Sequence, residues 1–218
     1  QEIVQELNWP RSSAFNIVAT LVDEGYLYQP TPRGGYSPTT RWMELAKKLT
    51  ESQPLPNTIH NKLVELMEKT GETLFLATAE GSNLVFLDVI EPSADIRFSA
   101  NVGQRLPIHI TAAGRAILSQ YTATERKAVL GRINYQPYEK QKFLNAASVQ
   151  EDIVNSAKQG WYINMGLYAP GVAGIAVPFP YQNRRLAISL GGPVNRVEAH
   201  AHKYGKLLLH ATRELLRI

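Results

Sequence analysis

The order of apolar and helix-breaking residues over the first forty positions constrains the fold of this chain most. Apolar residues recur at helical spacing over 3–7, and Asn8-Trp9-Pro10 interrupts the series. A second helical series runs over 11–24 and stops at Gly25, a residue typical of helix C-termini. The Pro- and Gly-rich segment 29–35 separates two short extended segments, which predicts a β-hairpin. Helix, short turn, helix and hairpin together predict a winged helix-turn-helix.

The second helix of this pattern carries candidate DNA-binding residues. At about 1.5 Å per residue it is about 20 Å long, enough to lie in a major groove. Hydrogen-bonding side chains at the positive end of a helix suit phosphates and base edges. Two alternatives stay open: the serines assist helix initiation while the arginine at the hairpin tip is solvated, or the winged helix serves protein contacts. The candidates are Arg11, Ser12, Ser13 and Asn16 on the helix and Arg33 on the hairpin.

Net charge does not decide between these interpretations. The chain of 218 residues has a formal charge of +4, but residues 1–50 contain five basic and five acidic side chains. The excess positive charge therefore belongs to the rest of the chain. The prediction of DNA binding depends on the pattern and not on bulk charge.

A proline-rich segment predicts the boundary between two domains. A helix predicted over 40–52 is followed by Gln53-Pro54-Leu55-Pro56-Asn57, after which the apolar pattern starts again. We therefore expect a helix-turn-helix domain over 1–39, a linker helix over 40–54 and a second domain over 55–218.

The second domain mixes helical and strand patterns and predicts an α+β fold. Two apolar runs, Thr73–Ala79 and Asn83–Ile90, flank Glu80-Gly81-Ser82 and predict a hairpin. A further extended run is expected over Asp95–Ala100. Thr111 is expected to begin a helix of small residues over 112–118. Further helices are predicted over 59–70, 124–131, 148–160 and 195–218, and strands over 161–165, 174–179 and 186–190.

Composition excludes several classes of protein. The chain has no cysteine, which excludes disulfides, thiolate metal sites and a cysteine nucleophile. It has no apolar run long enough to cross a bilayer and no signal peptide, so we expect a cytoplasmic protein. The hydrophobic fraction of 44% is ordinary for a globular chain.

Three stretches, in order and with the linker helix between the first two, resemble the IclR family of bacterial transcriptional regulators. They are 10–27, 102–118 and 160–193, the last with Pro170-Gly171-Val172 and Ile188–Pro193. The resemblance implies a winged-helix domain whose first helix is absent here, a linker helix and a GAF-like effector domain. It also implies a homodimer or homotetramer on a palindromic operator of double-stranded DNA. A small organic metabolite would modulate that binding, and no cofactor is implied; the family contains both repressors and activators.

The resemblance also implies an effector pocket. Backbone amides of Ala112 and Ala113 would form its anion cradle, which agrees with the exposed amides and dipole at a helix start. Without the resemblance, the Ala/Gly run would be interpreted as close helix packing. The remaining pocket positions implied by the family are Phe98, Leu106, Asn164, Val172, Gly174, Ser189 and Gly191.

The chain departs from the family at several of these positions. Some members have an acid at the position of Asn164, a cysteine at that of Gly174 and a serine at that of Gly191, so we expect a roomier, less acidic pocket. Trp161, Tyr162 and Tyr168 lie in or next to the closing segment, where aromatic rings suit an aromatic or medium-sized carboxylate. Trp161 and Tyr162 fit a core position equally well. Many members have Arg at the position of Asn16, so the operator sequence does not transfer from relatives.

Two other classes of function remain as alternatives. An enzyme would use His109 with the hydroxyl of Thr111 or Ser189, but no nucleophile elbow, phosphate loop or metalloprotease motif is present, and we expect no catalytic or metal site. His200 and His202 are two residues apart on a predicted helix and point to different faces. A ligand-independent interaction module would use the apolar faces of 195–218 and the linker helix to pair with a second copy.

Overall fold

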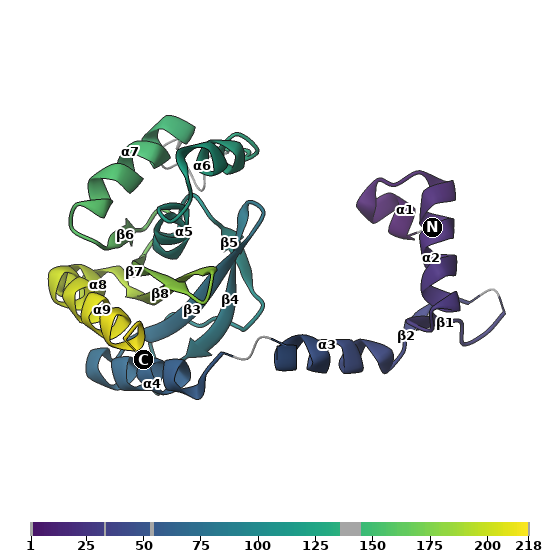
Figure 1. Ribbon diagram of the computed structural model, residues 1–218, viewed down its shortest axis with the longest axis horizontal. Helices are drawn as coiled ribbons and strands as arrows, with labels where there is room; N and C mark the ends of the chain where they lie inside the picture. Colours follow the sequence, from purple (N-terminus) through teal and green to yellow (C-terminus); the bar gives the residue numbers. More distant parts are fainter. Residues whose placement is uncertain (1, 33, 53–54, 136–144, 218) are drawn as a thin grey trace. The chain divides into compact units, whose positions relative to one another are not determined.

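The structure is a computed structural model that describes the chain except residues 1, 33, 53–54, 136–144 and 218 (Figure 1). The chain divides into two compact units, Gln1–Leu55 and Pro56–Ile218, one residue from the boundary predicted by the proline-rich segment. Among the described residues, no helix is both long enough and apolar enough to cross a membrane.

The first unit has the elements of a winged helix-turn-helix. Asn8, at φ 50°, turns the chain between its first two helices, and Gly25, at φ 72°, turns it after the second. The last helix is attached to the hairpin, because the indole nitrogen of Trp42 donates to the carbonyl of Tyr26 at 2.9 Å. The elements are α1 (Glu2–Leu7), α2 (Arg11–Asp23), β1 (Leu27–Tyr28), β2 (Ser37–Pro38) and α3 (Arg41–Ser52).

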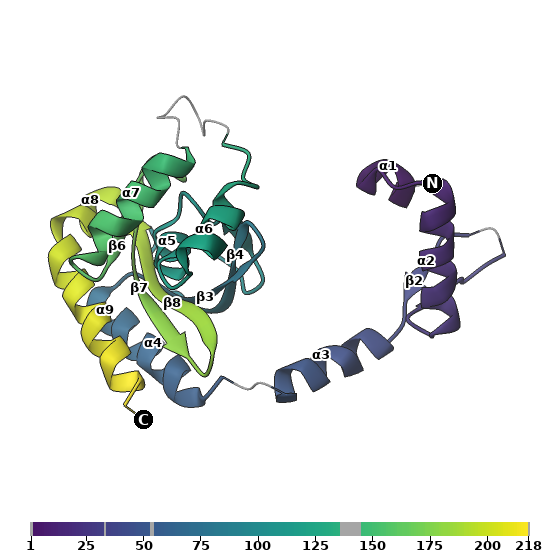
Figure 2. The same ribbon diagram turned by 45° about the horizontal axis from the view of Figure 1, so that its top comes forward.

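The second unit is an antiparallel sheet with helices on both faces, which confirms the α+β class (Figures 1 and 2). In the part of the chain that the structure describes, the strand order is β5-β4-β3-β8-β7-β6. The strands are β3 (Thr73–Glu80), β4 (Asn83–Ile90), β5 (Arg105–Pro107), β6 (Tyr162–Met165), β7 (Val172–Tyr181) and β8 (Arg184–Pro193). The helices are α4 (Asn57–Thr70), α5 (Ala112–Leu118), α6 (Ala123–Leu130), α7 (Ala146–Ala157), α8 (Val194–Ala199) and α9 (Ala201–Leu215).

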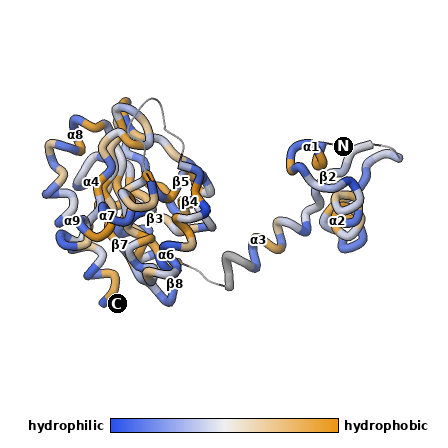
Figure 3. Tube along the Cα trace, turned by 90° about the horizontal axis from the view of Figure 1, so that it is seen from above, coloured by the Kyte–Doolittle hydropathy of each residue, from blue (hydrophilic) through white to orange (hydrophobic). Residues whose placement is uncertain are grey.

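The sheet is buried on both faces. Hydrophobic stretches lie along the strands at the centre of the unit (Figure 3). On β3, Leu74 and Leu76 alternate with Phe75 and Ala77, and all four are at most 3% exposed. Phe75 and Ala77 belong to the core beneath α5, so Leu74 and Leu76 face the side covered by α4 and α9.

The extended run expected over Asp95–Ala100 is not part of the sheet. The carboxylate of Glu91 binds this segment. Glu91 accepts from the Ala100 amide at 3.0 Å, the Ser99 hydroxyl at 2.8 Å and the Arg97 guanidinium at 2.7 Å. The Arg97 guanidinium is the main cause that holds the pKa of Glu91 below its usual value.

The expected continuous helix over 195–218 is wrong. It is interrupted at His200, whose backbone at φ −120° and ψ 10° leaves the helical region and separates α8 from α9. The break lets both segments bury apolar surface, since Val197 is 0% and Tyr204 6% exposed.

Candidate DNA-binding surface and effector cavity

One face of α2 is anchored and the other is exposed. Ala14 and Val18 are buried, whereas four of the five candidate DNA-binding residues are exposed. The helix begins after Pro10 without a side-chain cap, so neither serine hydroxyl caps it. Both serine side chains are exposed, and neither is used to begin the helix. The four exposed candidates are Arg11, Ser12, Ser13 and Asn16, while Arg33 lies outside the described residues.

The floor of a cavity in the second unit comes from three strands in register. Asn164 on β6 pairs with Gly174 on β7, and Gly174 pairs with Gly191 on β8. Two cross-strand glycines leave the sheet without side chains at this point. Phe75 on β3 pairs with Ser189, which lies two residues before Gly191 on β8. Phe75 therefore borders the same cavity.

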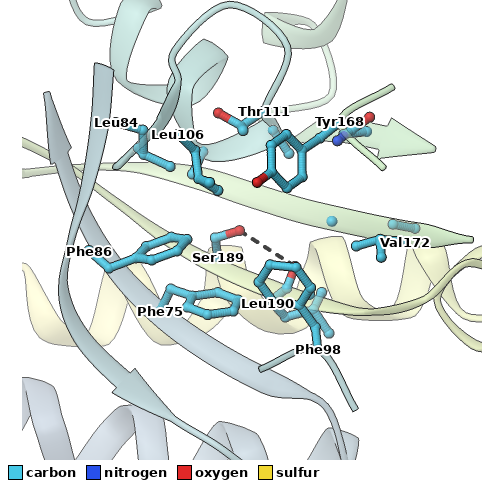
Figure 4. Close-up of a pocket in the computed structure, with 16 residues that line it drawn as sticks. Phe75, Leu84, Phe86, Phe98, Leu106, Thr111, Tyr168, Val172, Ser189 and Leu190 are labelled. Atoms are coloured by element: carbon cyan, nitrogen blue, oxygen red, sulfur yellow. Dashed lines mark hydrogen bonds between the residues drawn. The ribbon is translucent and has the colours of Figure 1, made fainter. Parts of the chain in front are cut away.

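The structure brings all nine sequence-predicted pocket residues together around this cavity (Figure 4). Its volume is about 50 Å³, and its lining is overwhelmingly apolar. The lining residues are Phe75, Leu84, Phe86, Phe98, Leu106, Thr111, Ala112, Ala113, Asn164, Tyr168, Val172, Ala173, Gly174, Ser189, Leu190 and Gly191.

Two phenylalanines that sequence reasoning missed make the cavity small. Phe75 stacks on Phe86 at 4.6 Å between ring centroids and meets the edge of Phe98 at 5.6 Å (Figure 4). A Cβ on Gly191 would lie 3.1 Å from the Phe75 ring, so this ring occupies the space that the glycine leaves. The Phe75 ring therefore reduces the space that Gly191 leaves beside the cavity. The alternation of side chains along β3 was the available sequence signal for Phe75. Only the register between β3 and β8 shows that this residue lies at the cavity.

The segment between β6 and β7 lies beside the cavity and contributes Tyr168 to its lining. Gly166 and Gly171, at φ 74° and 79°, bracket it, and the Asn164 side-chain oxygen accepts from the Leu167 amide at 2.9 Å. The Tyr168 ring lies over the cavity (Figure 4). Trp161 and Tyr162 do not reach the cavity, since both are buried in the core.

The start of α5 forms one wall of the cavity, and local contacts explain why the helix begins at this position. The Thr111 hydroxyl caps the helix by accepting from the Gly114 amide at 3.1 Å. Gly114 is required, because a Cβ there would lie 1.9 Å from the Ile108 carbonyl oxygen. The small-residue run thus serves close packing at Gly114 and lines the cavity at Ala112 and Ala113. The amide N–H groups of these two alanines have no hydrogen-bond partner among the described residues.

The groups that an enzyme would use are not arranged for catalysis. The Ser189 hydroxyl donates to the Ile175 carbonyl at 3.0 Å, and Thr111 caps α5. Burial, reinforced by the nearby Arg115 cation, lowers the pKa of His109 to about 4. In the described part of the chain, no hydrogen bond joins His109 to either hydroxyl. No group of three or more potential metal ligands occurs there either.

A winged helix-turn-helix unit followed by an α+β unit with an apolar cavity is the arrangement of a DNA-binding transcriptional regulator. Comparison with family models agrees with this class. The model of the bacterial transcriptional regulator IclR C-terminal domain matches residues 47–217, and that of the IclR helix-turn-helix domain matches residues 1–31. This chain belongs to the IclR family, and it is a DNA-binding transcriptional regulator and not an enzyme.

Individual relatives support the same conclusion. The transcriptional repressor IclR of Escherichia coli K12 is 24% identical over 219 residues, which cover 98% of this chain and 80% of the relative. The regulator KdgR of the same organism is 23% identical and covers 81% of this chain and 67% of the relative. Crystal structures of an IclR family regulator from Brucella abortus and of Thermotoga maritima IclR have TM-scores of 0.80 and 0.72. They are 21% and 22% identical, and cover 100% and 99% of this chain and 83% and 88% of theirs.

Proposed function

We propose that a small carboxylate in the cavity modulates the DNA binding of this regulator. The observation that supports it is a set of uncommitted donors in an otherwise apolar cavity. The amides of Ala112 and Ala113 are unpaired, and the side-chain nitrogen of Asn164 has no partner among the described residues although Asn164 is only 5% exposed. Donors held in an apolar site bind an anion more strongly than the same groups in water.

DNA is contacted, in this proposal, by Arg11, Ser12, Ser13 and Asn16 of α2 and by Arg33 of the hairpin. A homodimer or homotetramer would present two such helices about 34 Å apart, one turn of duplex, on a palindromic site. The exposure of the four α2 residues, and for the serines the lack of a capping role, support this assignment. Phosphate contacts of this kind weaken as salt rises, because each one releases a counterion.

The effector would act by population shift. A ligand that binds one arrangement of the two winged helices more tightly than another changes the affinity for DNA, and the coupling is reciprocal. The α3 helix is the segment that connects the two units along the chain and is the proposed route of coupling. Coupling of this kind usually changes affinity by about 5- to 150-fold.

The test measures DNA affinity of the full chain by fluorescence anisotropy, on a duplex selected from a random library. Acetate, butanoate and benzoate are added at constant salt, and we expect at least one of them to change the dissociation constant. Ala112→Leu should abolish this response and keep the affinity for DNA, because the side chain fills the cavity wall. Ala147→Leu, at an exposed position of α7, is the matched control. An unchanged dose response in Ala112→Leu would contradict the assigned site.

A further inference from the structure

The outward face of α9 carries only basic side chains. The helix lies at the outer edge of the second unit (Figures 1 and 2), and its inward face is anchored by the buried side chains of Tyr204, Leu208 and Leu215. Five residues of α9 are exposed, and each of them is a lysine, an arginine or a histidine. The anchored face therefore holds a row of cations toward solvent. The exposed residues are His202, Lys203, Lys206, His210 and Arg213.

Three of these residues form a basic stripe along one side of the helix. Lys203, Lys206 and Arg213 are separated by three and seven residues, which are close to one and two helical turns. At about 1.5 Å per residue, the basic stripe is about 15 Å long. One strand of a DNA duplex carries a phosphate about every 3.4 Å along the axis, so the basic stripe spans about four phosphates.

The three cations of the basic stripe are not neutralised by carboxylates. Elsewhere in the unit, cations are used in ion pairs, such as that of Arg196 with Glu72 at 2.7 Å. The side chains of the basic stripe make no hydrogen bond or ion pair among the described residues. The acidic residue of α9, Glu214, lies 3.0 Å from Lys62 of α4 and 3.3 Å from His210. The basic stripe therefore keeps its full charge for a partner.

A phosphate backbone fits this face better than a protein or a lipid surface. Lysine is depleted in protein interfaces, whose centres are aromatic and apolar, and a helix that lies on a membrane presents apolar side chains to the lipid. The outward face of α9 offers no such side chains. Residues 1–50 contain five basic and five acidic side chains, so the net charge of +4 comes from the rest of the chain. The attraction of this DNA-binding chain to a polyanion therefore originates outside the helix-turn-helix.

From these observations we propose that the basic stripe of α9 binds the phosphate backbone of duplex DNA and is a second DNA-contacting surface of this regulator. The inference does not depend on an effector, and it goes beyond the proposed function, in which α2 and the hairpin contact DNA. Contacts to phosphates carry no sequence information, so the basic stripe raises the affinity for any duplex to the same extent.

The experiment compares two variants of the full chain that lose the same charge. The stripe variant replaces the three cations of the basic stripe by glutamine, and the control variant replaces two exposed lysines and one exposed arginine elsewhere in the unit. Glutamine is a good helix former, so both variants are expected to fold. The substitutions are Lys203→Gln, Lys206→Gln and Arg213→Gln in the stripe variant and Lys127→Gln, Arg132→Gln and Lys158→Gln in the control variant.

Fluorescence anisotropy measures binding to a selected duplex and to a shuffled duplex of the same length, between about 50 and 200 mM salt. We expect the stripe variant to lose at least about ten-fold in affinity for both duplexes at the lowest salt concentration. The slope of log affinity against log salt should become shallower by about 2 to 3, because each lost phosphate contact removes about 0.9. The control variant should stay close to the wild type.

A third variant keeps the charge of the basic stripe and changes its side chains. Lys203→Arg, Lys206→Arg and Arg213→Lys together should retain the affinity and the salt dependence of the wild type, because a phosphate contact needs the cation. Equal affinity and slope in the stripe and control variants overturn the inference. A stripe variant whose oligomeric state in sedimentation differs from that of the wild type also overturns it, because this face would then pair with a second copy.

Discussion

Arg115 of α5 and Asp152 of α7 form an ion pair across the helical face of the effector domain. Arg115 Nε lies 2.9 Å from Asp152 Oδ2, and the side chain of Arg115 is only 2% exposed while that of Asp152 is 43% exposed. Arg115 Nη2 also donates to the Ile163 carbonyl of β6 at 2.6 Å. Burial lowers the pKa of Arg115, and the Asp152 carboxylate opposes that shift. Through these two contacts Arg115 connects α5, β6 and α7.

Removal of the Asp152 charge should destabilise the effector domain. Asp152→Asn leaves a buried guanidinium without its anion, which costs about 1–3 kcal/mol once the partial exposure of Asp152 is taken into account. Calorimetric unfolding of the full chain measures the change. Glu151→Gln, the exposed neighbour on α7, is the control and should unfold like the wild type. Equal stability of the two variants would show that solvent already screens the Arg115 charge.

Stability should fall between pH 7 and pH 5 because of His109. Its pKa is about 4 in the folded chain against 6.5 ordinarily, so the unfolded chain takes up a proton that the folded chain does not. The free energy of unfolding is therefore unaffected by His109 above pH 6.5 and decreases as the pH falls toward 4. At pH 5 the decrease amounts to about 2 kcal/mol. Glu65 and Glu125, whose pKa values are lowered to about 2, contribute only below pH 4.5.

His109→Phe tests this dependence, because it removes the titrating group and keeps an aromatic ring against Tyr135. The centroids of the His109 and Tyr135 rings are 5.0 Å apart. The decrease in free energy of unfolding between pH 7 and pH 5 should shrink by most of its value. His210→Gln, which removes an exposed histidine, should keep the decrease. A decrease that is the same in His109→Phe as in the wild type would assign it to other groups.

The serines of α2 provide a test of the DNA-contacting surface. Ser12→Ala with Ser13→Ala should weaken binding to a selected duplex by about ten-fold or more, since each lost contact to a base or phosphate removes about 1 kcal/mol. Helix stability should change little, because neither serine caps α2. Ser93→Ala, an exposed serine of the effector domain, is the matched control. Unchanged DNA affinity at the same salt concentration would remove these residues from the interface.

Asn164 provides a test of the charge of the ligand. Asn164→Asp keeps the oxygen that accepts from Leu167 and replaces the uncommitted nitrogen with a second oxygen. A carboxylate in the cavity would then face a like charge, so binding of butanoate should weaken at least 30-fold. The Gly174→Ala variant narrows the same region without charge and separates a steric effect from an electrostatic one. Tighter binding of an acid in Asn164→Asp would contradict an anionic effector.

The sequence by itself determined the local elements and the residues that border the cavity. Helical periods around Val18 and the glycine at 25 predicted the helix-turn-helix, and the resemblance brought Gly174, Ser189 and Gly191 to one site. These predictions succeeded because hydrophobic period and turn chemistry are properties of neighbouring residues along the chain.

Tertiary structure alone decided the size and chemistry of the cavity. The β3–β8 register places Phe75 opposite Ser189, where its ring fills the space beside Gly191. Glu91 binds the extended segment around Phe98, which pairs with no strand. Strand register and the approach of one segment to another depend on contacts between residues far apart in the chain, and no local period encodes them.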